Sequence, residues 1–285
     1  MTRTVLTIQS HVVAGHVGND AAAFALQRLG VEAWPIYTVQ FSNHTGHGAW
    51  TGQAFTAEHI HSLLDGLDAR GLLKRVDAVL SGYVGTVEIA GAIVDAAARV
   101  RQRNPNAVYC CDPVMGDVGR GLFVKPDIPG FFAATALASA DIITPNLYEL
   151  GLLAGTDTPK PAAAIGAVRE LLRQGPRIAL VTSVRDDEAH VDTLAVTATQ
   201  AWRVRTPWLD LDPMPSGMGD CTAALFLGHW LQHGDIPQAL VHAVSALYEL
   251  LTHADPTQPR ELNLIPMQQA LVQPRQRFAV DAIGA

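Results

Sequence analysis

The chain has few cysteines, few charged residues and no block of basic residues. Its 285 residues include three cysteines and 16% charged residues, and the formal net charge is −7. Because no stretch rich in lysine or arginine is present, nucleic acid is not an expected partner. The cysteines are too few to form a disulfide framework and lack the paired spacing of a zinc site, so we expect small buried thiols in a reducing compartment.

Long hydrophobic runs are missing as well. No apolar stretch reaches the ~18 residues of a membrane span, and no basic leader precedes an apolar segment at the N-terminus. We therefore expect neither a membrane protein nor an exported one, and we predict a cytoplasmic location. The hydrophobic content of 48% is typical of a compact protein with a large core.

Three common catalytic signatures are also absent. The chain has no Gly-x-x-x-x-Gly-Lys-Ser/Thr loop, no Gly-x-Gly-x-x-Gly after its first apolar run, and no serine nucleophile elbow. These absences argue against a P-loop enzyme, a dinucleotide dehydrogenase and an α/β-hydrolase.

Apolar runs of strand length alternate with helical patterns along the chain. This alternation, without repeats, linkers or low-complexity tracts, predicts one α/β domain over residues 1–285, with a mostly parallel, doubly wound central sheet flanked by helices. Strands are expected at 5–8, 31–39, 76–80, 107–111, 140–144 and 178–182, with one or two antiparallel strands in 190–204. Helices are expected at 21–29, 55–73, 87–103, 147–153, 160–174, 223–230, 237–252 and 264–272, and a small flap at 40–52.

Most of the predicted parallel strands end in a hydroxyl, a carboxylate or a glycine. Ligands of open α/β sheets bind outside the carboxyl ends of the strands, so these polar groups are expected to meet at one edge. The residues concerned are Ser10, Gly82, Tyr83, Asp112, Thr144, Thr182 and Ser183.

The stretch Gly217-Met218-Gly219-Asp220 precedes an apolar, alanine-rich helical pattern. Glycines allow a tight turn, and the free N–H groups at a helix start attract anions such as phosphate. A carboxylate there is poorly suited to hold phosphate but can take a proton from an attacking hydroxyl. The pattern therefore indicates phosphoryl transfer from a nucleotide to a small alcohol, although a plain turn with Asp220 as the helix N-cap fits the stretch as well.

Several short motifs occur together and in order between about residues 4 and 250. In combination they resemble the pyridoxal kinases of the ribokinase-like superfamily, which phosphorylate the 5′-hydroxyl of B6 vitamers with MgATP. The motif Gly217-Met218-Gly219-Asp220 is shared by the whole superfamily, and the other motifs are more specific. The motifs are Ser10-His11-Val12-Val13, Gly15-His16-Val17-Gly18-Asn19, Val39-Gln40-Phe41-Ser42-Asn43-His44-Thr45, Leu80-Ser81-Gly82-Tyr83, Cys111-Asp112-Pro113-Val114-Met115-Gly116-Asp117, Ile143-Thr144-Pro145-Asn146 and Gly217-Met218-Gly219-Asp220.

The resemblance assigns catalytic roles to the glycine stretch. It implies that Asp220 is the general base for the vitamer hydroxyl and also contacts the substrate. It implies that the N–H groups around Gly217, Met218 and Gly219 form the anion hole for the transferred phosphoryl group. The glycines at 116, 119 and 121 fit a lid that excludes water, with a mobile surface loop as the alternative.

The resemblance also implies sites for the vitamer, the metal and the nucleotide. Four of the implied residues also have structural alternatives. Asp112 is alternatively a turn-forming residue and Asp117 a solvated lid residue, whereas Glu149 is alternatively a surface acid and Tyr83 a core residue. His44 and His47 lie near the vitamer site in sequence. The implied residues are Ser10, Thr45, Gly46 and Tyr83 for the pyridine ring, Asp112, Asp117 and Glu149 for Mg²⁺, and Asp112, Thr144, Glu149, Thr182, Ser183, Thr206, Pro207, Trp208 and Leu209 for ATP.

One departure from the family pattern concerns Thr182 and Ser183, because many bacterial relatives carry a lysine at this place.

The resemblance predicts ATP-dependent formation of pyridoxal 5′-phosphate in vitamin B6 salvage, with pyridoxamine or pyridoxine as further acceptors. It also predicts a homodimer that uses Mg²⁺ and optionally a monovalent cation. One alternative is a hydroxymethylpyrimidine kinase on the same fold. The other is a vitamer-binding protein with little turnover, which the missing lysine keeps open.

Overall fold

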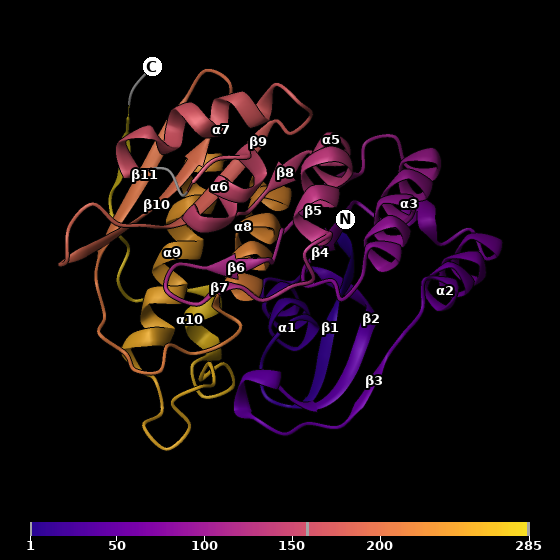
Figure 1. Cartoon of the computed structure of the whole chain (residues 1–285), viewed down its shortest axis with the longest axis horizontal. Coiled ribbons are helices and arrows are strands. Elements are labelled where there is room, and N and C mark those ends of the chain that lie inside the picture. The colour runs from indigo at the N-terminus through magenta and orange to yellow at the C-terminus, as the bar shows by residue number, and fades with distance from the viewer. Residues whose placement is uncertain (1, 158–159, 284–285) are drawn as a thin grey trace.

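The computed structural model describes residues 2–157 and 160–283. Within these ranges a ten-stranded sheet runs through the molecule in the order β12-β11-β10-β9-β8-β5-β4-β1-β2-β3, with helices on both faces (Figure 1). A separate two-stranded hairpin consists of β6 and β7. The strands are β1 (Thr4–Ala14), β2 (Glu32–Asn43), β3 (Gly52–Ala54), β4 (Ala78–Ser81), β5 (Val108–Cys111), β6 (Gly116–Asp117), β7 (Gly121–Leu122), β8 (Ile142–Ile143), β9 (Ile178–Val184), β10 (His190–Val196), β11 (Ala201–Pro207) and β12 (Val280–Ala282).

The sheet is mostly parallel, as predicted. Strands β2, β1, β4, β5, β8 and β9 run parallel to their neighbours, whereas β10, β11 and β12 at one end and β3 at the other pair antiparallel. The chain leaves β1 toward β2 on one side and returns to β4 on the other, so the winding direction reverses beside β1. Crevices at such a reversal are the usual ligand sites of open α/β sheets.

The helices cover both faces of the sheet, and their bounds match the sequence prediction best where a helix is long and amphipathic. The helix α3 spans Val87–Arg103 as expected, and the Thr86 side chain accepts a hydrogen bond from the N–H group of Ile89 to cap it. The α-helices are α1 (Asn19–Arg28), α2 (Ala57–Ala69), α3, α4 (Ile128–Phe131), α5 (Leu137–Ser139), α6 (Leu147–Ala154), α7 (Ala164–Leu172), α8 (Met218–His233), α9 (Ile236–Thr252) and α10 (Gln268–Val272). Short 3₁₀ turns are η1 (Thr45–His47), η2 (Leu73–Arg75) and η4 (Pro161–Ala163), and η3 (Phe132–Ala136) is a π-helical segment between α4 and α5.

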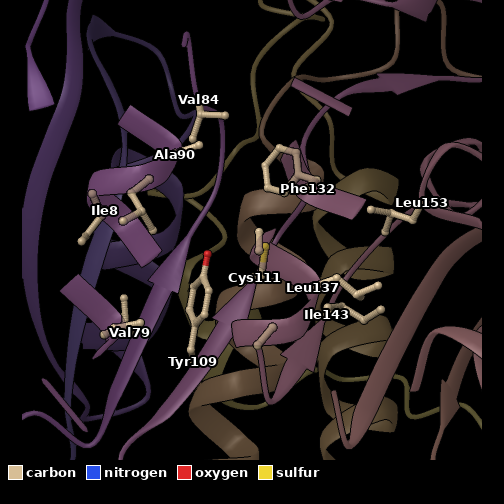
Figure 2. Packing of buried hydrophobic residues seen from close by; sticks show 14 of the residues in the cluster. Ile8, Val79, Val84, Ala90, Tyr109, Cys111, Phe132, Leu137, Ile143 and Leu153 are labelled. Atoms are coloured by element: carbon tan, nitrogen blue, oxygen red, sulfur yellow. The ribbon is translucent and has the colours of Figure 1, made fainter. Parts of the chain in front are cut away.

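The core lies in two layers, one on each face of the sheet, because successive strand residues point to opposite faces. Cys111 packs with Ile8 and Ile143 on one face, and Cys110 belongs to the cluster on the other. Figure 2 shows the Tyr109 ring within the first layer, where its hydroxyl lies 2.9 Å from Ser81 Oγ. This hydrogen bond satisfies a phenol that is only 1% exposed.

All three cysteines are free and buried, as expected. Burial raises the pKa of the Cys111 and Cys221 thiols to about 12, so both stay protonated and behave as small apolar side chains. No helix in the described part of the chain is both long and apolar enough to cross a bilayer.

The helix α1 begins at Asn19, two residues before its expected start at residue 21, and neither Asn19 nor Asp20 caps it. Gly18, which has no side chain, is the N-cap residue. Instead, the Asn19 amide donates to the carbonyl groups of Gln9 and Ile36, and Asp20 accepts from the N–H group of Val12. Both side chains therefore attach the helix to the carboxyl end of β1, where the candidate site lies.

Several element bounds also differ from the prediction. The expected helix at 160–174 begins at Ala164 after a short turn, and the one at 264–272 is confined to Gln268–Val272. The flap at 40–52 consists of the end of β2, the turn η1 and the start of β3. The segment from α4 to α5 and the edge strand β12 were not expected.

Candidate active site

A cavity of about 380 Å³ opens at the carboxyl ends of the parallel strands. The flap, the β6–β7 hairpin and the start of α8 complete its walls, so segments far apart in sequence converge there. The site residues predicted from the sequence that line it are Ser10, Thr45, Gly46, Tyr83, Asp112, Asp117, Thr144, Glu149, Thr182, Gly217, Met218, Gly219 and Asp220.

The glycine stretch forms the start of α8 through a left-handed turn. Gly217 is the N-cap residue, with φ of 83°, and a Cβ atom at this position would stand 2.0 Å from the carbonyl oxygen of His16. Only glycine fits this conformation and this close approach. No side chain caps α8, so the N–H groups of its first turn remain available to an anion in the cavity.

Asp220 is not the N-cap of α8 but its third residue, which removes the plain-turn interpretation of this aspartate. Its Oδ2 atom accepts a hydrogen bond of 2.8 Å from the N–H group of Gly18, and the residue lines the cavity. Burial raises the pKa of Asp220; the Gly18 bond opposes this rise and the Asp20 carboxylate adds to it. A carboxylate with a raised pKa, fixed in a cavity wall, is suited to accept a proton.

Asp112 lies opposite the start of α8, where a Cβ atom on Gly219 would stand 3.8 Å from its Oδ2 atom. Its Oδ1 atom accepts a hydrogen bond of 2.9 Å from the Thr144 hydroxyl, but Oδ2 is buried and has no hydrogen-bond partner in the described part of the chain. Burial raises the pKa of Asp112 well above its usual range, and the nearby carboxylates of Glu149 and Asp220 raise it further. A buried acceptor without a partner indicates a place for a bound group.

Glu149 anchors the base of the β6–β7 hairpin to α6. Its Oε1 atom accepts hydrogen bonds from the N–H groups of Met115 (2.9 Å) and Gly116 (3.4 Å), and its Oε2 atom accepts one from Asn146 (2.9 Å). The last bond is half of a capping box, in which Asn146 Oδ1 accepts from the Glu149 N–H group in return. Burial raises the pKa of Glu149 to about 7 although these N–H groups lower it.

The hairpin that carries the predicted lid glycines is an ordered two-stranded ribbon in this structure. Asp117 Oδ1 accepts a hydrogen bond of 2.7 Å from the N–H group of Val118, and burial raises the pKa of Asp117. Arg120, at the tip, lines the cavity, and its guanidinium carbon lies 5.8 Å from the centroid of the Phe123 ring. No group of three or more histidine, cysteine or carboxylate side chains within residues 2–157 and 160–283 is arranged to hold a metal ion by itself.

The residues predicted to hold the vitamer share the cavity lining with apolar side chains. Ser10, Thr45, Gly46 and Tyr83 line it together with Val12, Val17, Val39 and Phe41. His44 Nδ1 is 3.4 Å from Ser216 Oγ, and burial lowers the pKa of His44. A flat heterocycle with polar substituents fits such a wall.

Five residues predicted to bind the nucleotide lie outside the walls of this cavity: Ser183, Thr206, Pro207, Trp208 and Leu209. Ser183 is exposed with φ of 60°, and Thr206 is 5% exposed on β11. The Arg185 guanidinium covers the Trp208 ring at 3.8 Å from its centroid. Their assignment to ATP remains a prediction.

Sequence reasoning missed two contributors to the site. Arg120 is the one lysine or arginine among the described residues that line the cavity. The neighbouring glycines indicated a loop in the sequence, but they did not indicate that Arg120 lines the site. Gly18 holds Asp220, and a Cβ atom there would stand 2.3 Å from both Ser10 O and Ser10 Oγ. The Gly15-to-Gly18 motif was a signal for this turn, although it did not indicate which acid the turn would bind.

Comparison with known proteins gives a consistent relationship over the whole chain. The phosphomethylpyrimidine kinase family matches residues 25–261. Pyridoxal kinase PdxY of Deinococcus radiodurans is 52% identical over 290 residues, which cover 99% of this chain and 97% of that protein. The protein of the same name from Corynebacterium diphtheriae is 46% identical, and the match covers 98% of this chain and 99% of that protein.

Solved structures agree with the sequence relatives. Pyridoxal kinase from Leishmania donovani in complex with ADP and pyridoxamine has a TM-score of 0.92 at 28% identity, with coverage of 99% of this chain and 100% of that chain. The complex of the same enzyme with ADP and pyridoxine also has a TM-score of 0.92, at 29% identity. The predicted fold and the predicted relationship to pyridoxal kinases are both confirmed, and the chain belongs with them to the phosphomethylpyrimidine kinase family.

Proposed function

We propose that this chain transfers the γ-phosphoryl group of ATP to the 5′-hydroxyl of pyridoxal, with Asp220 as the general base. Pyridoxamine and pyridoxine are further candidate acceptors. The observation that carries this proposal is the position of Asp220, whose carboxylate shares a cavity wall with the uncapped start of α8. The similarity to pyridoxal kinases supports the choice of substrates.

The two oxygens of Asp220 have different environments, which supports its role as the base. The Gly18 N–H group binds Oδ2 and fixes the orientation of the carboxylate, and Oδ1 has no hydrogen-bond partner among residues 2–157 and 160–283. Oδ1 can therefore accept the proton of the vitamer hydroxyl as the hydroxyl oxygen attacks the γ-phosphorus and ADP leaves. Burial raises the pKa of Asp220, and a carboxylate with a raised pKa is a stronger base.

Stabilisation of the phosphoryl group is assigned to the backbone at the start of α8. The N–H groups around Gly217, Met218 and Gly219 face a growing negative charge from a fixed position, with the positive end of the helix dipole behind them. Because the turn is held by close packing of Gly217 on His16, little reorganisation is needed during the reaction.

The carboxylates opposite α8 fit a Mg²⁺ ion that accompanies ATP. Asp112 Oδ2 is buried and has no partner among the residues that the structure describes, and a hard oxygen donor in this state suits the cation. Glu149 and Asp117 already accept backbone hydrogen bonds, so they would contact the hydrated ion through water. Bound Mg²⁺ supplies neutralisation of phosphate charge, and the remaining ligand positions fall to water and phosphate oxygens.

Arg120 is assigned to the anionic substrate because it is the one basic lysine or arginine side chain in the described wall of the cavity. Its guanidinium makes no ion pair with a carboxylate among the described residues, and it faces a wall that carries four acids. Thr182 lines the wall where many relatives place a lysine, and Arg120 offers a positive charge from the hairpin instead. Thr144 also lines the wall near the proposed phosphate position.

A panel of acceptors tests the proposed function against its alternatives. With MgATP, we expect turnover of pyridoxal that exceeds turnover of hydroxymethylpyrimidine by at least tenfold, because Ser10, Thr45, Gly46 and Tyr83 are proposed to fit the pyridine ring. A preference for the pyrimidine alcohol would favour the hydroxymethylpyrimidine kinase. Vitamer binding without any phosphorylated product would favour the binding protein.

The biological setting belongs to the same proposal. We assign the chain to vitamin B6 salvage in the cytoplasm, and the free buried cysteines are compatible with a reducing compartment. A homodimer is proposed from the resemblance to pyridoxal kinases, and light scattering of the purified protein measures it.

A further inference from the structure

The segment that follows α9 folds back against the candidate site and places Glu261 beside it. Glu261 Oε2 accepts a hydrogen bond of 2.8 Å from the N–H group of His16, and its Oε1 atom lies 3.3 Å from Nε2 of His47. The Glu261 side chain is only 14% exposed. In the same segment, the carbonyl group of Arg260 accepts a hydrogen bond of 2.9 Å from the N–H group of Ser216.

The first of these contacts supports the turn that holds the proposed base. The carbonyl oxygen of His16 packs against Gly217, and two residues further along the N–H group of Gly18 binds Asp220. A shift of this turn would therefore move both the base and the start of α8. A Cβ atom at Gly15, where φ is 122°, would stand 2.9 Å from both Glu261 oxygens, so the turn and the carboxylate are in close contact.

The second contact reaches the flap. His47 is the last residue of η1, the short turn that carries Thr45 and Gly46 into the cavity wall. His47 itself is not part of that wall. The Glu261 carboxylate thus contacts both the Gly15-to-Gly18 turn, which holds Asp220, and the turn η1, which carries Thr45 and Gly46. Glu261 lies outside the cavity and connects these two parts of the site.

We propose that Glu261 is a positioning residue that holds the Gly15-to-Gly18 turn and the flap in register for phosphoryl transfer. This inference rests on the proposed function, since it assigns Asp220 to the base and Thr45 and Gly46 to the vitamer. Errors of about 1 Å in the placement of reacting groups can cost about 10²-fold in rate. The hydrogen bond to His16 sets the catalytic rate constant, and the contact with His47 sets the KM for the vitamer.

Two substitutions at Glu261 separate these effects. In Glu261→Gln the amide oxygen can still accept from His16, whereas the charge opposite His47 is lost. We expect a kcat within about twofold of wild type and a pyridoxal KM raised about two- to fivefold, which corresponds to ~0.4–1 kcal/mol. Glu261→Ala removes both contacts, and we expect kcat to fall about 10- to 100-fold as well.

The KM for ATP is the internal control in Glu261→Gln, because this variant keeps an acceptor for the His16 N–H group and so leaves the start of α8 in place. In Glu261→Gln it should stay within about twofold of wild type. Glu170→Gln, at a carboxylate paired with Arg173 on the surface, is the matched control and should match wild type. In a His47→Ala background, Glu261→Gln should raise the pyridoxal KM no further, since the partner is already gone.

Melting temperatures measured alongside distinguish positioning from a loss of folding. A folded Glu261→Ala protein with wild-type kcat would overturn the inference, as would equal changes in the KM values of ATP and pyridoxal in Glu261→Gln. Turnover is compared with wild type in every experiment. An inactive wild-type chain would contradict the proposed function, whereas an active wild type with an equally active Glu261→Ala variant would contradict only the role of Glu261.

Discussion

Replacing Asp112 by asparagine should stabilise the protein while it removes activity. Asp112 is 4% exposed, and its Oδ2 atom has no hydrogen-bond partner within the described residues. In Asp112→Asn the amide oxygen can keep the bond from Thr144, and the NH₂ group replaces the unpartnered oxygen with a donor near two carboxylates, Glu149 and Asp220. The variant also lacks the carboxyl group whose ionisation is disfavoured by burial and by these two neighbours.

The magnitude follows from the cost of the unpartnered oxygen. A buried polar atom without a partner costs about 1–3 kcal/mol, and more when it is charged. At about 2.1 cal/mol/K per residue, the 285 residues give an unfolding entropy near 0.6 kcal/mol/K. The gain in stability therefore corresponds to a rise in Tm of about 2–5 °C at neutral pH, measured by calorimetry without nucleotide or Mg²⁺.

The sign of the pH dependence gives a second check on the same variant. Burial raises the pKa of Asp112 in the folded state, so above the unfolded value of about 4 the folded protein still binds a proton that the unfolded chain has released. Wild-type stability therefore falls as the pH rises through this window. The advantage of Asp112→Asn should be small below about pH 4 and should grow toward neutrality.

Asp192 offers a matched control, because it is a buried aspartate that does have a charged partner. It is 5% exposed, and its carboxylate oxygens lie 2.7 and 2.8 Å from Nε and Nη2 of Arg205. Asp192→Asn should therefore destabilise the protein by about 1.5–3 kcal/mol. If Asp112→Asn lowers Tm as Asp192→Asn does, the Asp112 carboxylate is not the unpaired charge that the site geometry indicates.

Three further predictions concern catalysis. Arg120→Ala should lower kcat/KM for ATP about tenfold, as expected for the loss of one charge-assisted hydrogen bond of ~1.5 kcal/mol, and Arg120→Lys should recover part of this loss. An unchanged kcat/KM in Arg120→Ala would show that Arg120 does not contact the substrate. Because Asp220 must be ionised and burial raises its pKa, the acid limb of the kcat/KM profile should lie above the ordinary aspartate value of about 4; a limb at or below that value would argue against this base. Gly217→Ala should abolish turnover, since its Cβ would collide with the carbonyl of His16 at a left-handed φ; turnover near wild type would show that the start of α8 is not constrained as described.

Much of the fold was predictable because local patterns agree with tertiary structure. The alternation of strands and helices predicted the parallel sheet, and the long amphipathic α3 was predicted with its observed bounds. Five of the seven expected strand-end residues line the cavity, since the carboxyl ends of parallel strands meet at one edge, whereas Gly82 and Ser183 do not line it. Ser10, Asp112 and Thr144 all line the cavity as a result.

The rest could not be predicted because it depends on contacts that the local sequence does not encode. Glu261 reaches His16 across 245 positions, and no periodicity marks such a pair. The edge strand β12 carries too few residues for a pattern, and the helix expected at 264–272 begins four residues later, at Gln268. The difference at Asn19 has the same origin, because its amide satisfies two buried carbonyl groups rather than the helix start.

The central claim is that Asp220 accepts the proton of the vitamer hydroxyl. Asp220→Asn tests it most directly, because the amide oxygen can still accept the hydrogen bond from Gly18 while the side chain can no longer take a proton. We expect kcat for pyridoxal with saturating MgATP to fall about 10²- to 10⁴-fold, with the Kd for pyridoxal within about threefold of wild type by titration calorimetry. A variant that binds pyridoxal normally and retains wild-type kcat would contradict the account.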